Sequence, residues 1–432
     1  MGKVVPIGDG AGGDSARRRP RMPRRRRGKS DKTALVLGGG GFTGGVYEIG
    51  ALRALDLLAA NTTVNDFDVY IGTSAGSFVA SMTANGITPE EMMRVLNKAL
   101  PSPIDDPKLR HLLRPNYTAW ASRMATMPLR VVGTLRHLAN NVGEVSMVDL
   151  VMGLAEGLPT GIYNNQGLER YMAEVLADPD RSNDFRELSR ELLLTATDVD
   201  TCERLVLGRD EWRDVPISKA VAASTALPMV YEPVELRGRH LMDGGIASTT
   251  NVDVAVEAGA KFIVVVNPLV PFVNDFETRI PTMFGSRVRR VTDMGLPGIG
   301  NQAFRLMAYA RLQLAVESWK HRFPDVDIIL IEPEPNDELM FGTSVLDYSS
   351  RLQIARHGFE SVTDKLARDY KRYKDIAARH GIEISARRVR KVVETVEGQE
   401  AEGSSAWRRI LEQTTGALLR QSGEAETAAG DR

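Results

Sequence analysis

Cysteine is almost absent from this sequence. The single residue of that type, Cys202, cannot form a disulfide within the chain and cannot build a cysteine-based zinc site. The six histidines are scattered, and no two of them stand at the spacing of a metal-ligand pair. No apolar run approaches the roughly 18 residues that a membrane-spanning helix needs. We therefore expect a protein without a metal site or a transmembrane segment.

The composition is globular, with one strongly basic end. Hydrophobic residues make up 43% of the 432 residues and charged residues 26%, which is enough for a sizeable core. Residues 1–32 hold eleven Lys or Arg against three acids, a charge of +8, so the other 400 residues sum to −9. This segment lacks the apolar stretch of a secretory signal, and we expect a cytoplasmic protein.

Glycine and proline around the basic cluster predict that residues 1–32 form a disordered basic arm. The arm is either a solvated extension or an electrostatic tether to an anionic membrane or a nucleic acid. In the first case the protein is simply cytoplasmic, and in the second it makes peripheral membrane contact.

From residue 33 onward, short apolar strands alternate with helical patterns. The predicted strands are 33–37, 67–72, 191–197, 261–266 and 325–333. The predicted helices are 46–60, 89–100, 167–176, 217–223, 252–258, 302–323 and 346–380. Buried strands that alternate with helices indicate an α/β fold, with a mostly parallel sheet covered by helices on both faces.

Two regions depart from this rhythm. Residues 101–160 mix apolar and basic side chains without strand signals, which predicts a helical insertion, either an ordinary cap or an interfacial lid. Residues 386–432 predict a peripheral or disordered tail with one short helix. The catalytic domain would then span residues 33–385.

The stretch "DVYIGTSAGSFVASM" contains a G-x-S-x-G between a predicted strand and a predicted helix, with Ser74 at its centre. Such a turn can present the serine hydroxyl above a sheet as a nucleophile, because glycine on either side leaves room for a tight bend. The alternative is a serine in an ordinary strand-to-helix turn. The elbow residues are Gly72, Thr73, Ala75 and Gly76.

A glycine-rich loop follows the first predicted strand. Its residues Gly39 to Gly44 fit the G-x-G-x-x-G pattern of a dinucleotide site. That site would need an acidic residue at the end of the second strand, where "YIGTSAG" stands instead. Consecutive backbone N–H groups can also form an oxyanion hole. The candidate residues are Gly39, Gly40, Gly41, Phe42, Thr43 and Gly44.

A nucleophilic serine needs a base, and no histidine stands on a loop after an apolar strand. A carboxylate is the remaining choice, and Asp243 is the candidate, in "LMDGG" with Gly244 and Gly245. The competing interpretation of Asp-Gly-Gly is a hairpin turn.

Together these segments resemble the patatin-like phospholipase family. "LVLGGGGFTGGVYEIGALRAL" resembles its glycine block, and "IGTSAGS" its nucleophile elbow. "LTATDVDTCERLVL" and "AVAASTALPMVYEPVEL" resemble two core segments, the second with an Ala-Ser…Pro pattern at Ala223, Ser224 and Pro228. "LMDGGIASTTNVDVA" resembles its Asp-Gly-Gly block.

The resemblance implies the three-layer architecture of that family and a Ser–Asp dyad, with Ser74 as nucleophile and Asp243 as base. It implies a lipid substrate, an acyl-serine intermediate and no cofactor. No specific nucleic acid partner is implied, and the oligomeric state stays open. The alternatives are an esterase or acyltransferase on other acyl substrates, a nucleotide-binding protein, or a catalytically silent membrane scaffold.

Two positions depart from the family pattern. Phe42 and Thr43 stand where the glycine block usually carries Arg or Lys, and Asp253 stands where a proline usually follows Asp-Gly-Gly. Neither departure removes a group that the implied chemistry requires.

The basic arm gives a first prediction. Deleting residues 1–30 should leave turnover of a soluble short-chain ester unchanged, because the arm lies outside the predicted domain. If the arm is a tether, its deletion lowers binding to anionic vesicles, and salt has the same effect on the intact protein. Equal vesicle binding with and without the arm would identify a solvated extension.

Overall fold

The computed structural model describes residues 31–96, 113–140, 157–274, 280–281, 287–335, 337–342, 350–385 and 387–388. The predicted arm lies outside these residues except for Asp31 and Lys32, and so does the predicted tail except for residues 387–388. Lys32 is the first residue of a strand rather than the last of an arm, and its ammonium group contacts Glu191 Oε2 at 2.7 Å.

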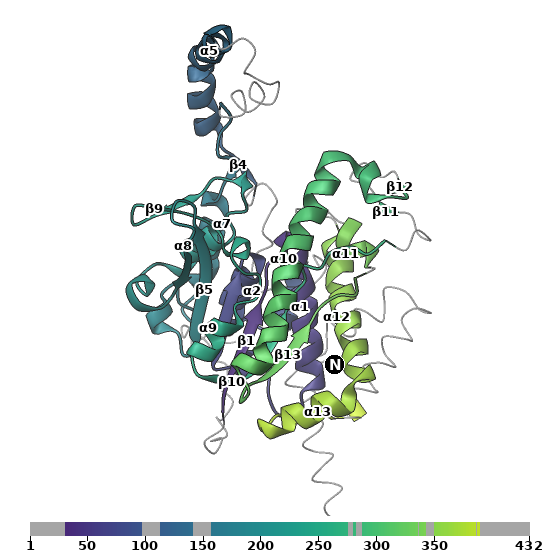
Figure 1. The fold of residues 1–432 in the computed structure, drawn as a ribbon. Helices are drawn as coiled ribbons and strands as arrows, with labels where there is room; N and C mark the ends of the chain where they lie inside the picture. Colours follow the sequence, from purple (N-terminus) through teal and green to yellow (C-terminus); the bar gives the residue numbers. More distant parts are fainter. Residues whose placement is uncertain are drawn as a thin grey trace, which may run out of the picture. The chain divides into compact units, whose positions relative to one another are not determined.

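A central sheet has the order β13-β10-β1-β2-β5-β9-β8, with β6 also paired to β5. The strands β13, β10, β1, β2 and β5 run parallel to one another, whereas β6 and β9 pair with β5, and β8 with β9, in antiparallel fashion. The predicted mostly parallel sheet is therefore confirmed (Figure 1). The strand bounds are β1 Lys32–Leu37, β2 Val69–Thr73, β5 Glu191–Asp198, β6 Arg204–Leu207, β8 Val234–Leu236, β9 Arg239–Asp243, β10 Ala260–Val266 and β13 Asp327–Ile331.

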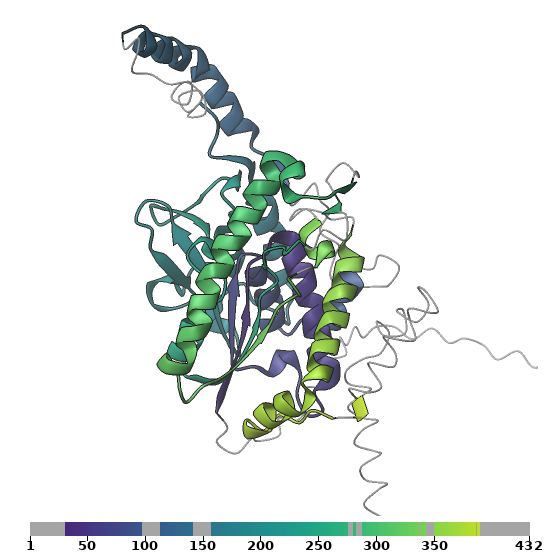
Figure 2. The ribbon, with the colours of Figure 1, turned by 45° about the vertical axis from the view of Figure 1, so that its right-hand side comes forward.

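Helices cover both faces of this sheet because alternate strand side chains point to opposite sides. In β1, Leu35 and Leu37 belong to one apolar core, while Ala34 and Val36 belong to the other. The first core includes side chains of α1 (Gly41–Leu58), α2 (Ala75–Ala84), α8 (Ile217–Ser224) and α12 (Arg351–Arg368). The second includes side chains of α9 (Val252–Glu257) and α10 (Gly295–Arg322). Figure 2 shows α10 in front of the strands.

The remaining elements are shorter or lie around this core. A small second sheet joins β3 (Arg114–Pro115), β4 (Gly161–Asn164) and β7 (Met229–Tyr231), and β11 (Ile280–Pro281) pairs with β12 (Arg287–Val288). The region predicted as a helical insertion contains α5. The further bounds are α3 Pro89–Leu96, α5 Tyr117–Asn140, α7 Gln166–Leu176, α11 Glu338–Gly342 and α13 Tyr370–Arg379.

Three predicted helices differ from the structure, and one of them, predicted over 46–60, is α1, which begins at Gly41. The single helix predicted over 346–380 is wrong, because the described part forms α12 and α13, with Asp369 between them at φ −104° and ψ 27°. The helix predicted from residue 302 begins at Gly295 instead. Pro297 is compatible with this earlier start because proline is tolerated in the first turn of a helix, where its missing N–H has no partner to lose.

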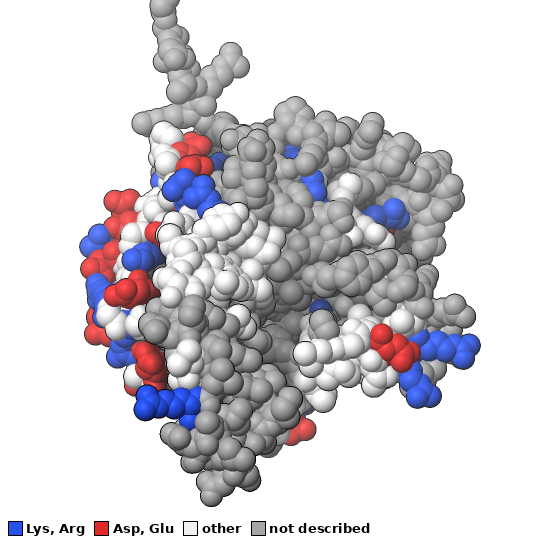
Figure 3. Space-filling model, turned by 90° about the horizontal axis from the view of Figure 1, so that it is seen from above, with Lys and Arg blue, Asp and Glu red and all other residues white. Residues whose placement is uncertain are grey.

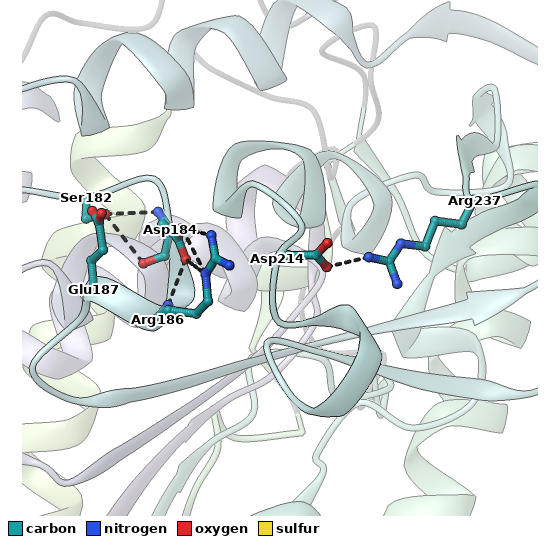
Figure 4. A network of polar contacts seen from close by, with 6 residues as sticks. All are labelled: Ser182, Asp184, Arg186, Glu187, Asp214 and Arg237. Atoms are coloured by element: carbon teal, nitrogen blue, oxygen red, sulfur yellow. Dashed lines mark hydrogen bonds and ion pairs between the residues drawn. The ribbon is translucent and has the colours of Figure 1, made fainter.

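The hairpin of β8 and β9 places Asp243 at the end of a sheet strand, and Arg237, in the turn of this hairpin, contacts neighbouring residues. The Arg237 guanidinium lies 5.3 Å from the centre of the Trp212 ring and pairs with the Asp214 carboxylate. Figure 4 shows this pair beside a second exposed network of Ser182, Asp184, Arg186 and Glu187. Exposed ion pairs of this kind add little stability, so the packing against Trp212 is the larger contribution of Arg237.

The face seen in Figure 3 lies above the carboxyl ends of the parallel strands as Figure 1 draws them. On it, many charged side chains of the described residues lie along the rim at the left and others lie at the lower right, and the surface next to the left rim is uncharged.

Helices α1 and α12 touch backbone to backbone through two glycines. A Cβ atom built on Gly50 would stand 2.0 Å from the Ala355 carbonyl oxygen, and one on Gly358 would stand 2.4 Å from the Tyr47 carbonyl oxygen. Neither backbone oxygen can move without shifting its helix. This contact fixes α12 against the helix that begins in the glycine loop.

Gly358→Ala should therefore destabilise the protein relative to Gly300→Ala, a matched change in a helix where an added Cβ meets nothing within 4 Å. Both variants gain up to about 1 kcal/mol of helix propensity, but only Gly358→Ala forces two helices apart, at roughly 1–3 kcal/mol. Thermal or denaturant unfolding measures the difference. Equal free energies of unfolding for the two variants would show that α1 and α12 can move apart without a measurable loss of stability.

Candidate active site

The G-x-S-x-G segment forms a sharp turn between β2 and α2. Ser74 lies between these elements with φ 54° and ψ −126°, a backbone conformation that non-glycine residues seldom adopt. A Cβ on Gly72 would stand 2.5 Å from Ser77 Cα, and one on Gly76 would stand 2.4 Å from the Leu37 carbonyl oxygen. Both glycines are thus required sterically. The Ser74 N–H donates to Ser224 Oγ at 2.9 Å, which helps to hold the turn.

Asp243 reaches Ser74 across one strand. Thr73 of β2 pairs with Thr195 of β5, and the next residue, Ala196, pairs with Asp243 at the end of β9. The Ser74 hydroxyl donates to Asp243 Oδ2 at 2.5 Å. The Gly245 N–H donates to Asp243 Oδ1 at 2.7 Å, so both carboxylate oxygens have a donor.

The Asp-Gly-Gly segment is a short 3₁₀ turn, Gly244–Ile246, that follows β9 and leads away from it. A Cβ on Gly244 would stand 2.4 Å from the Thr195 carbonyl oxygen, so only glycine fits there. A Cβ on Gly245 would come within 3.0 Å of Asp243 Oδ1. Both glycines therefore let the turn pack close to β5 and to the carboxylate.

The glycine loop lies against Ser74. A Cβ on Gly39 would stand 3.3 Å from Ser74 Cβ, and Gly41 has φ 62°. No hydrogen bond within the described part of the chain uses the N–H of Gly39, Gly40 or Gly41. These donors stand at the N-terminus of α1, where the helix dipole favours negative charge.

The later residues of the loop are engaged in the helix or the core. The Gly44 N–H donates to the Gly40 carbonyl at 3.0 Å, so it is not available to a ligand. Thr43 is buried, and Phe42 packs against the core. Of the six predicted oxyanion residues, the available donors are those of the first three.

The family comparison follows this geometry. Residues 35–256, just over half of the 432 residues, match a model described as patatin-like phospholipase. The chain belongs to the patatin-like phospholipase family. The match covers β1, the glycine loop, Ser74 and Asp243, and it ends within α9.

The chain is also similar, at low identity, to two curated viral proteins. A probable lipid hydrolase of Invertebrate iridescent virus 6 is 21% identical over 229 residues, which cover 52% of this chain and 63% of that protein. An uncharacterized protein of Acanthamoeba polyphaga mimivirus is 23% identical over 214 residues, 49% of this chain and 57% of that one. The chain thus spans about six-tenths of the length of these relatives.

The solved structures that are similar to this chain have low TM-scores. VipD from Legionella pneumophila is 14% identical with a TM-score of 0.30, over 93% of this chain and 88% of that one. The type III effector protein ExoU is 15% identical with a TM-score of 0.34, over 93% and 63%. Human GIVD cytosolic phospholipase A2 is 10% identical with a TM-score of 0.29, over 84% and 60%. The patatin-like assignment rests on the sequence match and the sheet.

One family departure has a structural explanation. Asp253, at the usual proline position, forms an ion pair with Arg204 at 2.7 Å. Arg204 also donates to Asn251 Oδ1 at 2.9 Å. The Asn251 amide in turn donates to Thr73 Oγ1 at 2.8 Å, directly before Ser74. Asp253 thus anchors a chain of contacts beneath the elbow, which the sequence pattern alone did not reveal.

Three of the described histidines lie next to carboxylates other than Asp243. His240 faces Asp200 at 3.6 Å, His357 contacts Asp337, and His380 Nε2 lies 2.8 Å from Asp327 Oδ2. Among the described residues, no group of three or more metal-ligating side chains is arranged to hold an ion. None of the described helices has the length and apolar character to cross a bilayer.

Burial sets the ionisation of Asp243. Its side chain is almost inaccessible to water, and this desolvation raises its pKa from 3.8 to about 6. The hydrogen bonds from Ser74 and the Gly245 N–H act in the opposite direction. At neutral pH the group is therefore ionised, with a basicity close to the working pH of a general base.

This raised pKa has a cost in stability. Because the pKa of Asp243 is higher in the folded state, its protonation adds to the free energy of unfolding. This contribution is fully present at pH values below the ordinary pKa near 3.8, and it is lost as the pH rises through about 6. Asp243→Asn cannot titrate. It should therefore stabilise the protein at pH 8 by roughly 1–3 kcal/mol, and this gain should vanish near pH 4.

Unfolding midpoints across pH test this expectation. Asp180→Asn is the matched control, since it makes the same substitution at an exposed position outside the site. A destabilised Asp243→Asn at pH 8 would indicate that Asp243 is needed structurally.

Proposed function

We propose that this protein hydrolyses fatty-acyl esters of lipids, with Ser74 as nucleophile and Asp243 as its base. The observation that carries the proposal is the 2.5 Å hydrogen bond from the Ser74 hydroxyl to the buried Asp243 carboxylate, formed within a strained turn. A serine and a base in hydrogen-bond contact are the minimum for acyl transfer. Family membership supports a lipid rather than another acyl compound.

In the first half-reaction, Ser74 Oγ attacks the ester carbonyl carbon while Asp243 Oδ2 takes the hydroxyl proton. The carbonyl oxygen becomes an oxyanion, and the N–H groups of Gly39, Gly40 and Gly41 are the donors we assign to it. The proton then passes to the departing alcohol, and the acyl group stays on Ser74. Collapse of the tetrahedral intermediate breaks the ester bond.

In the second half-reaction, water attacks the acyl-serine while Asp243 accepts a proton from it. The same donors hold the second oxyanion, and Ser74 leaves with its proton restored. Asp243 is held for both steps by the Gly245 N–H, which leaves Oδ2 directed at Ser74. The chemistry requires no cofactor.

The dinucleotide alternative has less support. The second strand, β2, ends at Thr73 and is followed by Ser74 rather than by an acidic residue, and Gly39 lies close to Ser74. A pyrophosphate on this loop would occupy the space in front of the nucleophile. The geometry therefore favours an oxyanion over a nucleotide.

Ser74→Ala should abolish ester hydrolysis without unfolding the protein, because only one hydroxyl is lost. A fluorophosphonate probe should label Ser74 and no other serine. Ser81→Ala is the matched control on the same helix, since its buried hydroxyl donates to the Ser77 carbonyl at 2.7 Å and lies outside the proposed machinery. Mass spectrometry of the labelled protein and ester turnover are the measurements. Undiminished turnover in Ser74→Ala would overturn the proposal.

Asp243→Asn should lower kcat at least ~10²-fold, the lower range for loss of a general base. The Ser74→Ala/Asp243→Asn double variant should be no worse than either single variant, because the two residues act as a unit. In the wild type, kcat/KM should fall about tenfold per pH unit below the Asp243 pKa of about 6. An active Asp243→Asn, or a folded but inactive His240→Gln, His357→Gln or His380→Gln, would show that the base is elsewhere.

A further inference from the structure

Helix α10 carries an apolar face that points away from the protein. Five of its large apolar side chains are exposed at 43–86%. They form the apolar stripe, defined as Leu296, Ile299, Leu306, Met307 and Leu314. At about 100° per residue these positions fall within an arc of about 100°, so they share one side of the helix over five turns.

The opposite side of the helix is buried: Ala308, Leu312 and Trp319 pack into the protein there, and Arg305 lies among them. Arg305 is 2% exposed, and its guanidinium donates to the Val270 carbonyl at 3.0 Å and the Met340 carbonyl at 2.9 Å. The Gln302 amide exchanges two hydrogen bonds with the backbone of Phe272. Large apolar groups therefore occur on both the buried and the exposed side of α10, whereas a helix that faces water usually exposes polar groups. A surface of this kind fits an apolar partner.

The stripe lies at the end of the sheet where the proposed active site stands. Because α10 leads into the parallel strand β13, it runs against the strand direction, and its N-terminal half reaches the carboxyl ends of the strands (Figure 2). Its contacts with Val270 and Phe272, just after β10, agree with this placement. Arg311, beside the stripe, donates to the Ile246 carbonyl in the turn that follows Asp243.

The charge around the stripe is positive. The segment 295–316 contains no acidic residue. Arg289, Arg290 and Arg311 are exposed at or near the stripe, against the exposed acids Asp293 and Glu317 in the described residues 287–317. An apolar band with cationic neighbours complements an anionic lipid surface, which offers acyl chains and phosphate groups together.

We propose that the apolar stripe of α10 docks this protein onto anionic lipid surfaces and turns the Ser74–Asp243 site toward them. The proposal rests on the proposed function, because a lipid hydrolase must meet substrate that stays in an interface. The hydrogen bond from Arg311 joins α10 to the turn after Asp243. When α10 lies against lipid, this turn therefore lies near the same lipid surface.

The test uses the full chain and vesicles of phosphatidylcholine with or without phosphatidylglycerol. Leu306→Ser/Met307→Ser should lower vesicle partitioning roughly tenfold or more, because it removes much of the exposed apolar area. Glu317→Ser/Lys320→Ser is the matched control: it introduces the same residue on the same helix, keeps the net charge and leaves the stripe intact. The swap Leu306→Met/Met307→Leu should bind like the wild type.

High salt separates the stripe from the basic arm, because it screens charge and leaves apolar contact in place. Wild type should keep part of its vesicle binding at high salt, and Leu306→Ser/Met307→Ser should lose it. Turnover of a soluble short-chain ester should be unchanged in all three variants. Hydrolysis of vesicle lipid should fall with partitioning in the serine variant alone.

Several outcomes would overturn the docking proposal. One is equal vesicle binding by wild type and Leu306→Ser/Met307→Ser. A second is a change of oligomeric state in that variant, which would assign the stripe to another copy of this chain. A third is stronger vesicle binding after removal of residues 391–432, which would assign the stripe to the tail. Absence of soluble ester turnover in wild type would instead refute the proposed function, while vesicle binding still reports on docking.

Discussion

The hydrogen bond between Ser74 and Asp243 places demands on the structure far beyond the two residues. A 2.5 Å contact requires β2, β5 and β9 to keep one register, since Asp243 approaches Ser74 over the residue pair Thr195 and Ala196. Close approach of these strand ends is possible because Gly72, Gly76 and Gly244 leave no side chain in the gap. A shift of β9 by one residue would move the Asp243 carboxylate away from the Ser74 hydroxyl.

The same contact explains why the site is supported from beneath by polar side chains. Thr73 and Thr195 share a hydrogen bond of 2.9 Å, and Asn251 donates to both hydroxyls. A buried carboxylate and a strained serine raise the free energy of the folded state. Several contacts from the surrounding residues must therefore hold both side chains in place. Arg204 and Asp253 extend this support to the surface, where an ion pair can be solvated.

Much of this could be predicted from the sequence because the signals are local. Continuous apolar strands revealed the parallel core, and fixed glycine spacing marked the turns at Ser74 and Asp243. The antiparallel strands β6 and β8 were missed because they are short and only partly buried, with weak apolar patterns. The start of α10 was missed because Gly295, Pro297 and Gly300 are residue types with low helix propensity. The polar support at Arg204 joins residues about 50 positions apart, so tertiary contact alone reveals it.

The glycine contact between α1 and α12 bears on how a growing chain acquires its active site. The glycine loop lies at the N-terminus of α1. One side of α1 is covered by α12, which is much later in the sequence and ends at Arg368. During synthesis Ser74 and Asp243 leave the ribosome well before α12 does, and domains complete such non-local packing late. A nascent chain therefore carries Ser74 and Asp243 before α12 packs against α1. If the protein has the proposed function, hydrolytic activity would arise only after α12 has been synthesised and has packed against α1.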